Sequence, residues 1–206
     1  RGRHPAFLRI APKAEMKLLL LRHGATEATE RRLYCGKTDL PLSLSGRREL
    51  LRLKEKGIYP PMEGYRILTS GMLRCEQTLA LLCGDVPHEQ NRAFREMDFG
   101  DFEMHSYQEL QNDPAYREWI SGDYRRNLCP GGESGVIQKA RVLTGLRELI
   151  HQGRDTLLIT HGGVISILME DLFPDVEKTR FQWQPKPGSG YLILLDRGRN
   201  HFLPLG

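Results

Sequence analysis

Two histidines in this chain each follow a short apolar run and precede a glycine. Lys17–Leu21 leads into Arg22-His23-Gly24, and Thr156–Thr160 leads into His161-Gly162-Gly163. An unprotonated imidazole nitrogen is a nucleophile that can carry a transferred group, and an adjacent arginine offers a planar fork of donors to phosphate oxygens. Either histidine alone is more simply a strand-end residue without a role, but two at matching positions favour a site for phosphate chemistry.

The two apolar runs must be placed side by side for this chemistry to work. Each has the length of a strand that is buried on both faces, as in a parallel sheet. Ligands of open parallel sheets bind beyond the carboxyl ends of the strands. We therefore expect Lys17–Leu21 and Thr156–Thr160 to be neighbouring central strands with His23 and His161 on the same rim.

The rest of the chain alternates between helical and strand-like patterns. Helices are predicted at Ser45–Lys56 and Met72–Leu82, as two short pieces of Ser106–Ile120 interrupted at Pro114, from Val136 to near Gly153, and near Val164–Leu172. Further strands are predicted at Arg66–Thr69, as an edge strand at His88–Phe94, and as a hairpin of Tyr191–Asp196 and His201–Leu203 around Arg197–Asn200. This order predicts a three-layer α/β/α sandwich with a mostly parallel sheet.

Charge and composition exclude several classes of protein. The formal net charge is +4, but residues 1–15 carry four basic side chains and one acidic one, so the remainder is near neutral. Nucleic-acid or membrane binding therefore has no support from charge, and no apolar run approaches the length of a membrane span. The four cysteines are scattered, which favours reduced thiols in a cytoplasmic protein over a zinc site or a disulfide framework.

The first residues are treated separately. Met16-Lys17-Leu18 resembles a native start followed at once by a strand. We interpret residues 1–15 as a tag or upstream extension and residues 16–206 as one domain, while an ordered native arm remains the alternative. The oligomeric state stays open, a homodimer included.

Five motifs in order resemble the signatures of the histidine phosphatase superfamily, which includes phosphoglycerate mutases and α-ribazole phosphatases. They extend over most of 16–203 and comprise Arg22-His23-Gly24-Ala25-Thr26, the loop 34–46 that begins with Tyr34-Cys35-Gly36, Thr69–Thr78 with its Arg74, Arg95–Glu103, and Ile159–Gly163. The turn Pro130–Ser134 matches as well. The resemblance implies a phosphoglycerate mutase-like fold.

The resemblance also implies roles. His23 corresponds to the nucleophile, Glu96 to the proton donor, and Arg22, Arg74 and His161 to a cationic pocket around the phosphoryl group. Thr26, Gly36 and Gly162 are expected to complete the binding of a small phosphate ester. Since arginines already supply positive charge, neither a metal nor another cofactor is expected.

Some candidates remain open on spacing alone. Asp98, Asp101 and Glu103 compete with Glu96 for the acid role, and Asp98 is the strongest competitor. Glu133 is interpreted as a helix-start residue. Three aromatic side chains lie where they could cover a substrate, although packing is the simpler role for each: Tyr107, Tyr116 and Trp119.

Within the superfamily the segment 94–134 resembles the α-ribazole phosphatase branch most, and the chain lacks the longer insertion of cofactor-dependent mutases. We therefore expect a phosphomonoesterase acting on α-ribazole 5′-phosphate. The alternatives are a broad-specificity or sugar-phosphate phosphatase, then a phosphoglycerate mutase, and last a non-catalytic phospholigand-binding protein. The chain departs from the family pattern at two positions, with Thr29 in place of Asn and Met104 in place of Gly. Both changes leave the five expected catalytic residues intact, so they bear on which substrate is bound and not on the reaction type.

Overall fold

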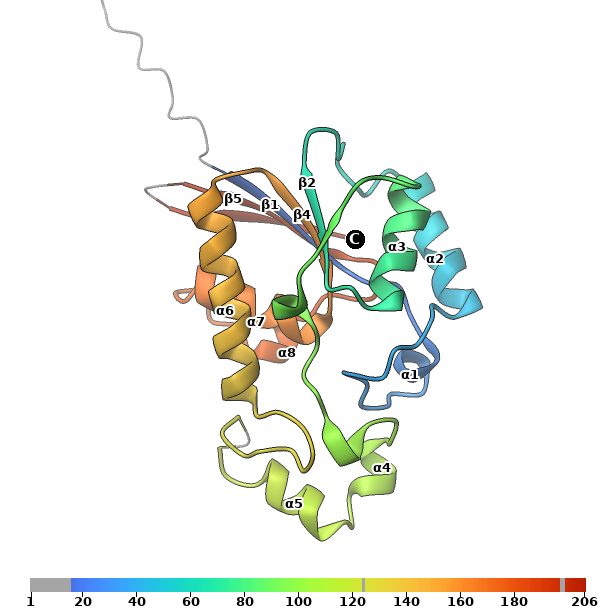
Figure 1. The fold of residues 1–206 in the computed structure, drawn as a ribbon, viewed down its shortest axis with the longest axis vertical. Helices are drawn as coiled ribbons and strands as arrows, with labels where there is room; N and C mark the ends of the chain where they lie inside the picture. The colour runs from blue at the N-terminus through green and yellow to red at the C-terminus, as the bar shows by residue number, and fades with distance from the viewer. Residues whose placement is uncertain (1–15, 124, 197–198) are drawn as a thin grey trace, which may run out of the picture.

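A six-stranded sheet forms the centre of the computed structural model, which describes residues 16–123, 125–196 and 199–206 (Figure 1). The strand order is β3-β2-β4-β1-β5-β6. The strands are β1 (Met16–Arg22), β2 (Arg66–Thr69), β3 (Glu89–Gln90), β4 (Thr156–Thr160), β5 (Gly190–Leu195) and β6 (His201–Leu205). Neighbours from β3 to β1 pair in parallel, whereas β5 is antiparallel to both β1 and β6.

Helices cover both faces of the sheet, as predicted. The α-helices of the described residues are α1 (Glu27–Glu30), α2 (Leu44–Glu55), α3 (Leu73–Cys83), α4 (Tyr107–Leu110), α5 (Pro114–Ile120), α6 (Gly135–Gln152), α7 (Gly162–Leu172) and α8 (Arg180–Trp183), of which α4 and α5 lie away from the sheet (Figure 1). In β1, Leu18 and Leu20 pack in a cluster with α6 and α7, while Leu19 and Leu21 pack in another cluster with α3. This alternation makes the sheet the middle layer of three.

The two histidine-terminated strands are neighbours at the centre of the sheet. β1 pairs in parallel with β4, and Arg22 lies opposite Thr160 in the register. Since His23 and His161 each follow the last residue of their strand, both leave the sheet at the same rim. The prediction of adjacent central strands is confirmed.

The predicted edge strand at His88–Phe94 is wrong in extent. Only Glu89–Gln90 pairs with β2, and Arg92–Phe94 forms a 3₁₀ turn. The side chain of Asn91 accepts a hydrogen bond from the backbone N–H of Ala93 at 2.9 Å, which caps this turn. Phe94 is fully buried in the core, so the chain turns inward instead of continuing along the sheet edge.

Three further differences concern short elements. The helices α1 and α8 have only four residues each, and no periodic pattern announces them; each is held by a capping box, at Thr26–Thr29 and at Thr179–Gln182. The predicted terminal hairpin is present, but β6 extends to Leu205. Part of its expected turn, residues 197–198, lies outside the described residues, as do residues 1–15.

The helices α4 and α5 lie beyond the rim of the sheet (Figure 1), and a second, smaller hydrophobic core packs around them. We call it the aromatic lobe, and it comprises Tyr34, Met97, Phe99, Phe102, Leu110, Tyr116, Trp119 and Cys129. The hydroxyl groups of Tyr34 and Tyr116 are 2.7 Å apart, which ties the loop after α1 to α5. The carboxyl ends of the central strands therefore face the aromatic lobe, which has a hydrophobic core of its own.

In the described part of the chain, no helix is long and apolar enough to cross a membrane.

Candidate phosphoryl-transfer site

His23 is buried just past the end of β1, and its ring has a defined tautomer. Nδ1 lies 2.7 Å from the carbonyl oxygen of Gly24, which can only accept, so Nδ1 carries the proton and Nε2 does not. Burial and the charges of Arg74 and Arg22 hold the pKa of His23 well below its usual value. The ring is therefore neutral near pH 7, with one nitrogen free to act as a nucleophile.

His161 faces His23, with ring centroids 5.1 Å apart. Nε of Arg74 donates to His161 Nδ1 at 3.3 Å, so the ring proton is on Nε2, which lies 2.9 Å from the hydroxyl of Ser70. Burial, followed by the charge of Arg74, lowers the pKa of His161 well below its usual value. A positive charge on His161 therefore depends on a neighbouring anion, because the arginines alone disfavour its protonation.

Arg74, on the first turn of α3, is almost fully buried. Its Nη1 donates to the carbonyl of Thr38 at 2.9 Å and its Nη2 to the carbonyl of Gly36 at 2.8 Å. The loop that carries Gly36 thus holds the guanidinium in one orientation. A side chain at position 36 would collide with the Met97 carbonyl, since a Cβ built there lies 1.6 Å from that oxygen.

The carboxylate of Glu103 holds this loop in turn. It accepts hydrogen bonds from the backbone N–H groups of Gly36, Lys37, Thr38 and Phe99 and from the Thr38 hydroxyl, at 2.7–3.2 Å. All these donors belong to the loop and its neighbour Phe99, and Glu103 does not line the cavity that Glu96 lines, so Glu103 is poorly placed to serve as the acid.

Arg22 contributes a second guanidinium. Its Nη1 donates to the carbonyl of Pro185 at 2.8 Å, and its buried Nε has no partner within the described residues. Burial lowers the pKa of Arg22, and the charge of Glu96 opposes this effect. Arg22 and Glu96 line the same cavity, which therefore has both a cation and a carboxylate in its wall.

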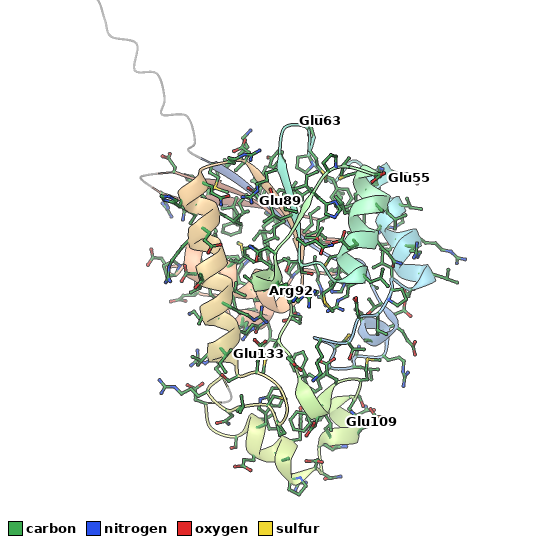
Figure 2. All side chains as sticks on the ribbon, in the orientation of Figure 1. Glu55, Glu63, Glu89, Arg92, Glu109 and Glu133 are labelled. Atoms are coloured by element: carbon green, nitrogen blue, oxygen red, sulfur yellow. The ribbon has the colours of Figure 1, made fainter. Side chains whose placement is uncertain are left out.

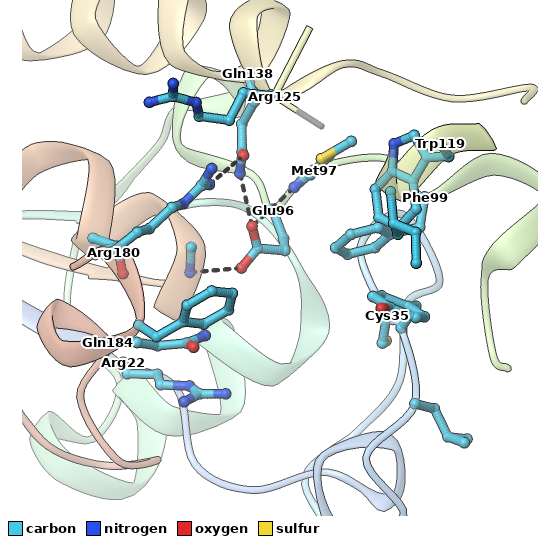
Figure 3. A pocket seen from close by; sticks show the side chains of 17 residues that line it. Arg22, Cys35, Glu96, Met97, Phe99, Trp119, Arg125, Gln138, Arg180 and Gln184 are labelled. Carbon is cyan, nitrogen blue, oxygen red and sulfur yellow. Dashed lines mark hydrogen bonds between the residues drawn. The ribbon is translucent and has the colours of Figure 1, made fainter. Parts of the chain in front are cut away.

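Glu96 belongs to the segment Arg95–Glu103, and its carboxylate lies against the start of α7. Its Oε1 accepts from the side-chain amide of Gln138 at 2.7 Å and from the backbone N–H of Met97 at 3.0 Å, while Oε2 accepts from the backbone N–H of Gly163 at 2.9 Å (Figure 3). These donors fix the carboxylate in the wall of the cavity. Among the four acidic candidates of the loop, Glu96 alone lines it.

Two further carboxylates near Glu96, those of Asp98 and Glu133, have structural partners. Asp98 accepts from the backbone N–H of Gly100 and pairs with Lys37 at 3.2 Å. Glu133 pairs with Arg141 through two hydrogen bonds of 2.8–2.9 Å and lies at the base of α6 (Figure 2). Its interpretation as a residue of the helix start agrees with this position just before α6.

The space around these side chains consists of two connected chambers. The inner chamber, of about 560 Å³, is lined by His23, Thr26, Arg74 and Gly162, among other residues. The outer chamber, of about 490 Å³, is bounded by α8, the start of α6 and the aromatic lobe. Seven residues line both: Arg22, Leu33, Tyr34, Cys35, Glu96, Phe181 and Gln184.

The three expected binding residues are close to the inner chamber in different ways. Thr26 caps α1 with its hydroxyl, which accepts from the backbone N–H of Thr29 at 3.3 Å. Gly162 is the first residue of α7, whose N-terminal end favours an anion. Gly36 does not line the cavity and acts through its carbonyl on Arg74.

Of the three aromatic candidates, Trp119 lines the outer chamber and Tyr107 the inner one. Tyr116 is buried inside the aromatic lobe and lines neither, so the packing interpretation holds for it.

Sequence reasoning missed four residues of the site: Ser70, Gln138, Gly163 and Arg180. Gln138 offered a signal, since it lies one turn before Val142 on the buried face of α6 and interrupts an otherwise apolar pattern. No signal marked Arg180, because α8 itself was not predicted.

No group of three or more His, Cys, Asp or Glu side chains in the described ranges is arranged to hold a metal ion.

A parallel-sheet rim with an unprotonated imidazole nitrogen, one buried and one half-buried guanidinium group and a cavity-lining carboxylate is typical of one class, the α/β proteins that transfer phosphoryl groups through histidine. The sequence profile of the histidine phosphatase superfamily (branch 1) matches residues 18–205, and the chain belongs to this family.

Relatives include the adenosylcobalamin/α-ribazole phosphatase of Salmonella typhimurium, 31% identical over 76% of this chain and 79% of that protein. A 2,3-bisphosphoglycerate-dependent phosphoglycerate mutase of Xanthobacter autotrophicus is also 31% identical, over 77% and 83%. The crystal structure of the α-ribazole phosphatase from Shigella flexneri aligns with a TM-score of 0.78 at 26% identity, covering 92% of this chain and 96% of that one. The predicted family and fold class are confirmed.

Proposed function

We propose that this chain is a phosphomonoesterase that works through a phosphohistidine at His23, with α-ribazole 5′-phosphate as its substrate. The observation that carries the chemistry is the hydrogen bond from His23 Nδ1 to Gly24, which leaves Nε2 unprotonated beside Arg74. The α-ribazole phosphatases among the relatives support the choice of substrate.

The reaction has two steps. In the first, Nε2 of His23 attacks phosphorus, the bond to the ester oxygen breaks, and Glu96 gives its proton to the leaving alkoxide. In the second, water attacks the phosphohistidine, Glu96 takes a proton from that water, and the electron pair of the N–P bond returns to Nε2. Arg22 and Arg74 stabilise the charge that spreads over the phosphoryl oxygens.

The outer chamber supports a substrate with a large apolar part. Its walls include Leu33, Met97, Phe99, Trp119 and Ile120. α-Ribazole carries a flat dimethylbenzimidazole ring on its ribose, and such a ring suits aromatic walls. A three-carbon phosphoglycerate would leave this chamber unfilled.

Turnover of matched esters tests the proposed substrate. Burying about 100 Å² of apolar ring surface is worth about 2.5 kcal/mol, so kcat/KM for α-ribazole 5′-phosphate should exceed that for ribose 5-phosphate by on the order of 50-fold. Equal values would leave a broad-specificity or sugar-phosphate phosphatase. Interconversion of phosphoglycerates faster than hydrolysis would make the chain a mutase, and no turnover of any ester, activated aryl phosphates included, would leave a binding protein.

Glu96→Gln tests the proton donor. Single-turnover phosphorylation by an ester with a poor alcohol leaving group should fall about 100-fold or more, whereas an activated aryl phosphate should lose far less, because its leaving group needs little protonation. Equal losses, or a larger contrast in Asp98→Asn, would move the role away from Glu96.

The setting of the enzyme is also inferred. Four free thiols, Cys35, Cys75, Cys83 and Cys129, support a reducing, cytoplasmic location. Independence of metals stays a prediction: turnover should survive exhaustive chelation, and phosphate or vanadate should compete with the substrate. The assignment of residues 16–206 to one catalytic domain, a homodimeric state and the lack of a nucleic-acid partner are likewise predictions.

A further inference from the structure

Gln138 is a fully buried polar side chain on the face of α6 that packs toward the core. Its neighbours one and two turns later on this face are Val142 and Leu146, which are apolar and buried. Burying an amide is costly unless its donors and acceptor find partners. A methionine of similar length would fill the same space without that cost, so the amide calls for an explanation beyond packing.

The amide connects two charged groups. Nε2 of Gln138 donates to Oε1 of Glu96 at 2.7 Å, and Nη2 of Arg180 donates to the Gln138 carbonyl oxygen at 2.8 Å (Figure 3). A reversed amide would place its oxygen against the carboxylate and its NH₂ against the guanidinium. Arg180 therefore determines which end of the amide Glu96 meets.

This arrangement makes the two oxygens of Glu96 different. Oε1 accepts two hydrogen bonds, from Gln138 and from Met97 N–H, which occupy both of its lone pairs. Oε2 accepts one, from Gly163 N–H, and keeps a lone pair. Only Oε2 is thus free to exchange a proton with a group in the cavity that Glu96 lines.

We propose that Gln138, oriented by Arg180, is a positioning residue that holds Glu96 so that Oε2 delivers and recovers the proton in both steps. This rests on the proposed role of Glu96. Gln138 itself does not exchange a proton. Without its amide, Oε1 loses a donor, and the carboxylate can rotate so that neither oxygen stays within reach of the ester oxygen.

Three substitutions test this role. Gln138→Met removes both hydrogen bonds at nearly constant volume, Arg180→Met removes only the outer partner, and Arg180→Lys keeps a donor for the Gln138 oxygen. Lys139→Met, one residue further on the exposed side of α6, is the matched control. Phosphorylation is followed in a single turnover with an alkyl phosphate and with an activated aryl phosphate, and the melting temperature of every variant is measured.

In Gln138→Met the rate with the alkyl ester should fall about 30-fold and the rate with the aryl ester less than about 3-fold, because only the former needs the proton. Arg180→Met should show a smaller contrast of the same direction, Arg180→Lys should restore most of the alkyl rate, and Lys139→Met should change neither rate.

Equal losses for both esters in Gln138→Met and Arg180→Met, or no loss, would overturn the positioning role while leaving Glu96 as proton donor if Glu96→Gln retains its own contrast. If the melting temperature of Gln138→Met lies far below that of the native chain, the test rests on Arg180→Met, because Arg180 is partly exposed and its replacement should disturb folding less. A larger loss of rate with the alkyl ester than with the aryl ester in Arg180→Met would then support the positioning role. If Glu96→Gln shows no contrast, both the proposed proton donor and this inference fail.

Discussion

At the scale of single residues, the first prediction concerns His23, the proposed nucleophile. His23→Ala should abolish the phosphoenzyme and nearly all turnover, because His23 lines the inner chamber with an unprotonated Nε2, whereas the unprotonated Nδ1 of His161 already accepts a hydrogen bond from Arg74. Mass spectrometry of rapidly quenched enzyme should locate phosphate on His23. Phosphate on His161, with His23 unlabelled, would reverse the two roles.

Met104 is a residue under local strain. Its φ of 62° lies in the left-handed region, which favours glycine, and this accounts for the glycine that is usual here in the family. Met104→Gly should therefore raise the free energy of unfolding by about 0.5–1 kcal/mol, after the entropy cost of the added glycine. Urea titration measures this.

His105→Gly is the control for Met104→Gly. The backbone of His105 is not in the left-handed region, so this substitution should not raise the free energy of unfolding. A loss of stability in Met104→Gly would mean that packing of the methionine outweighs its backbone strain. Activity measured on the same samples would show whether the methionine also affects the substrate.

At the scale of elements, the loop 35–38 depends on one carboxylate. Glu103→Gln replaces an acceptor that five donors share with an amide whose NH₂ group opposes them. The loop should loosen, Arg74 should lose its fixed orientation, and unfolding should cost about 1–3 kcal/mol less. The inhibition constant of vanadate should rise, whereas Asp101→Asn in the same segment should leave it unchanged.

Sequence patterns predicted the elements whose own residues decide their structure. β1 and β4 contain the uninterrupted apolar runs Leu18–Leu21 and Leu157–Ile159, and α6 repeats apolar residues over its 18 positions, so a local pattern is enough to predict them. The short α1 and α8 depend on capping boxes, and the turn at Arg92–Phe94 depends on the burial of Phe94. The capping boxes are local, but a helix of four residues is too short to show a helical period. The burial of Phe94 depends on packing against residues far along the chain, which a local pattern does not contain.

The same division applies to the site. His23, Arg22, Arg74, Glu96 and His161 were found because they stand in recognisable motifs. Gln138 and Arg180 were missed because their roles depend on contacts between residues far apart in the sequence. Gln138 bonds Glu96, and Arg180 bonds Gln138, and each pair is separated by 42 residues.

At the scale of the whole molecule, the two buried histidines should make stability depend on pH. Burial lowers the pKa of His23 and of His161 in the folded chain, so the unfolded chain binds their protons first as the pH falls. The free energy of unfolding is therefore not reduced by these histidines above pH ~6.5. Below this pH it falls by about 1.4 kcal/mol per pH unit for each histidine.

Urea titrations between pH 7.5 and 5.5 measure this slope, and His23→Asn should make it shallower by up to about 1.4 kcal/mol per unit. His88, whose pKa is raised by its bonds to the Val86 carbonyl and Glu76, works in the opposite direction, but its exposure makes its share small. An unchanged slope in His23→Asn would show that folding does not lower the pKa of this ring.

The placement of the two tryptophans gives the molecule a built-in optical reporter. Trp183 is fully enclosed in the core beside α7, whereas Trp119 forms part of the wall of the outer chamber. A change in emission when a nucleoside phosphate enters should therefore come from one indole, and Trp119→Phe should abolish it. Trp119 fluorescence would therefore report binding of a ligand in the outer chamber as it happens, independently of the hydrolysis that follows.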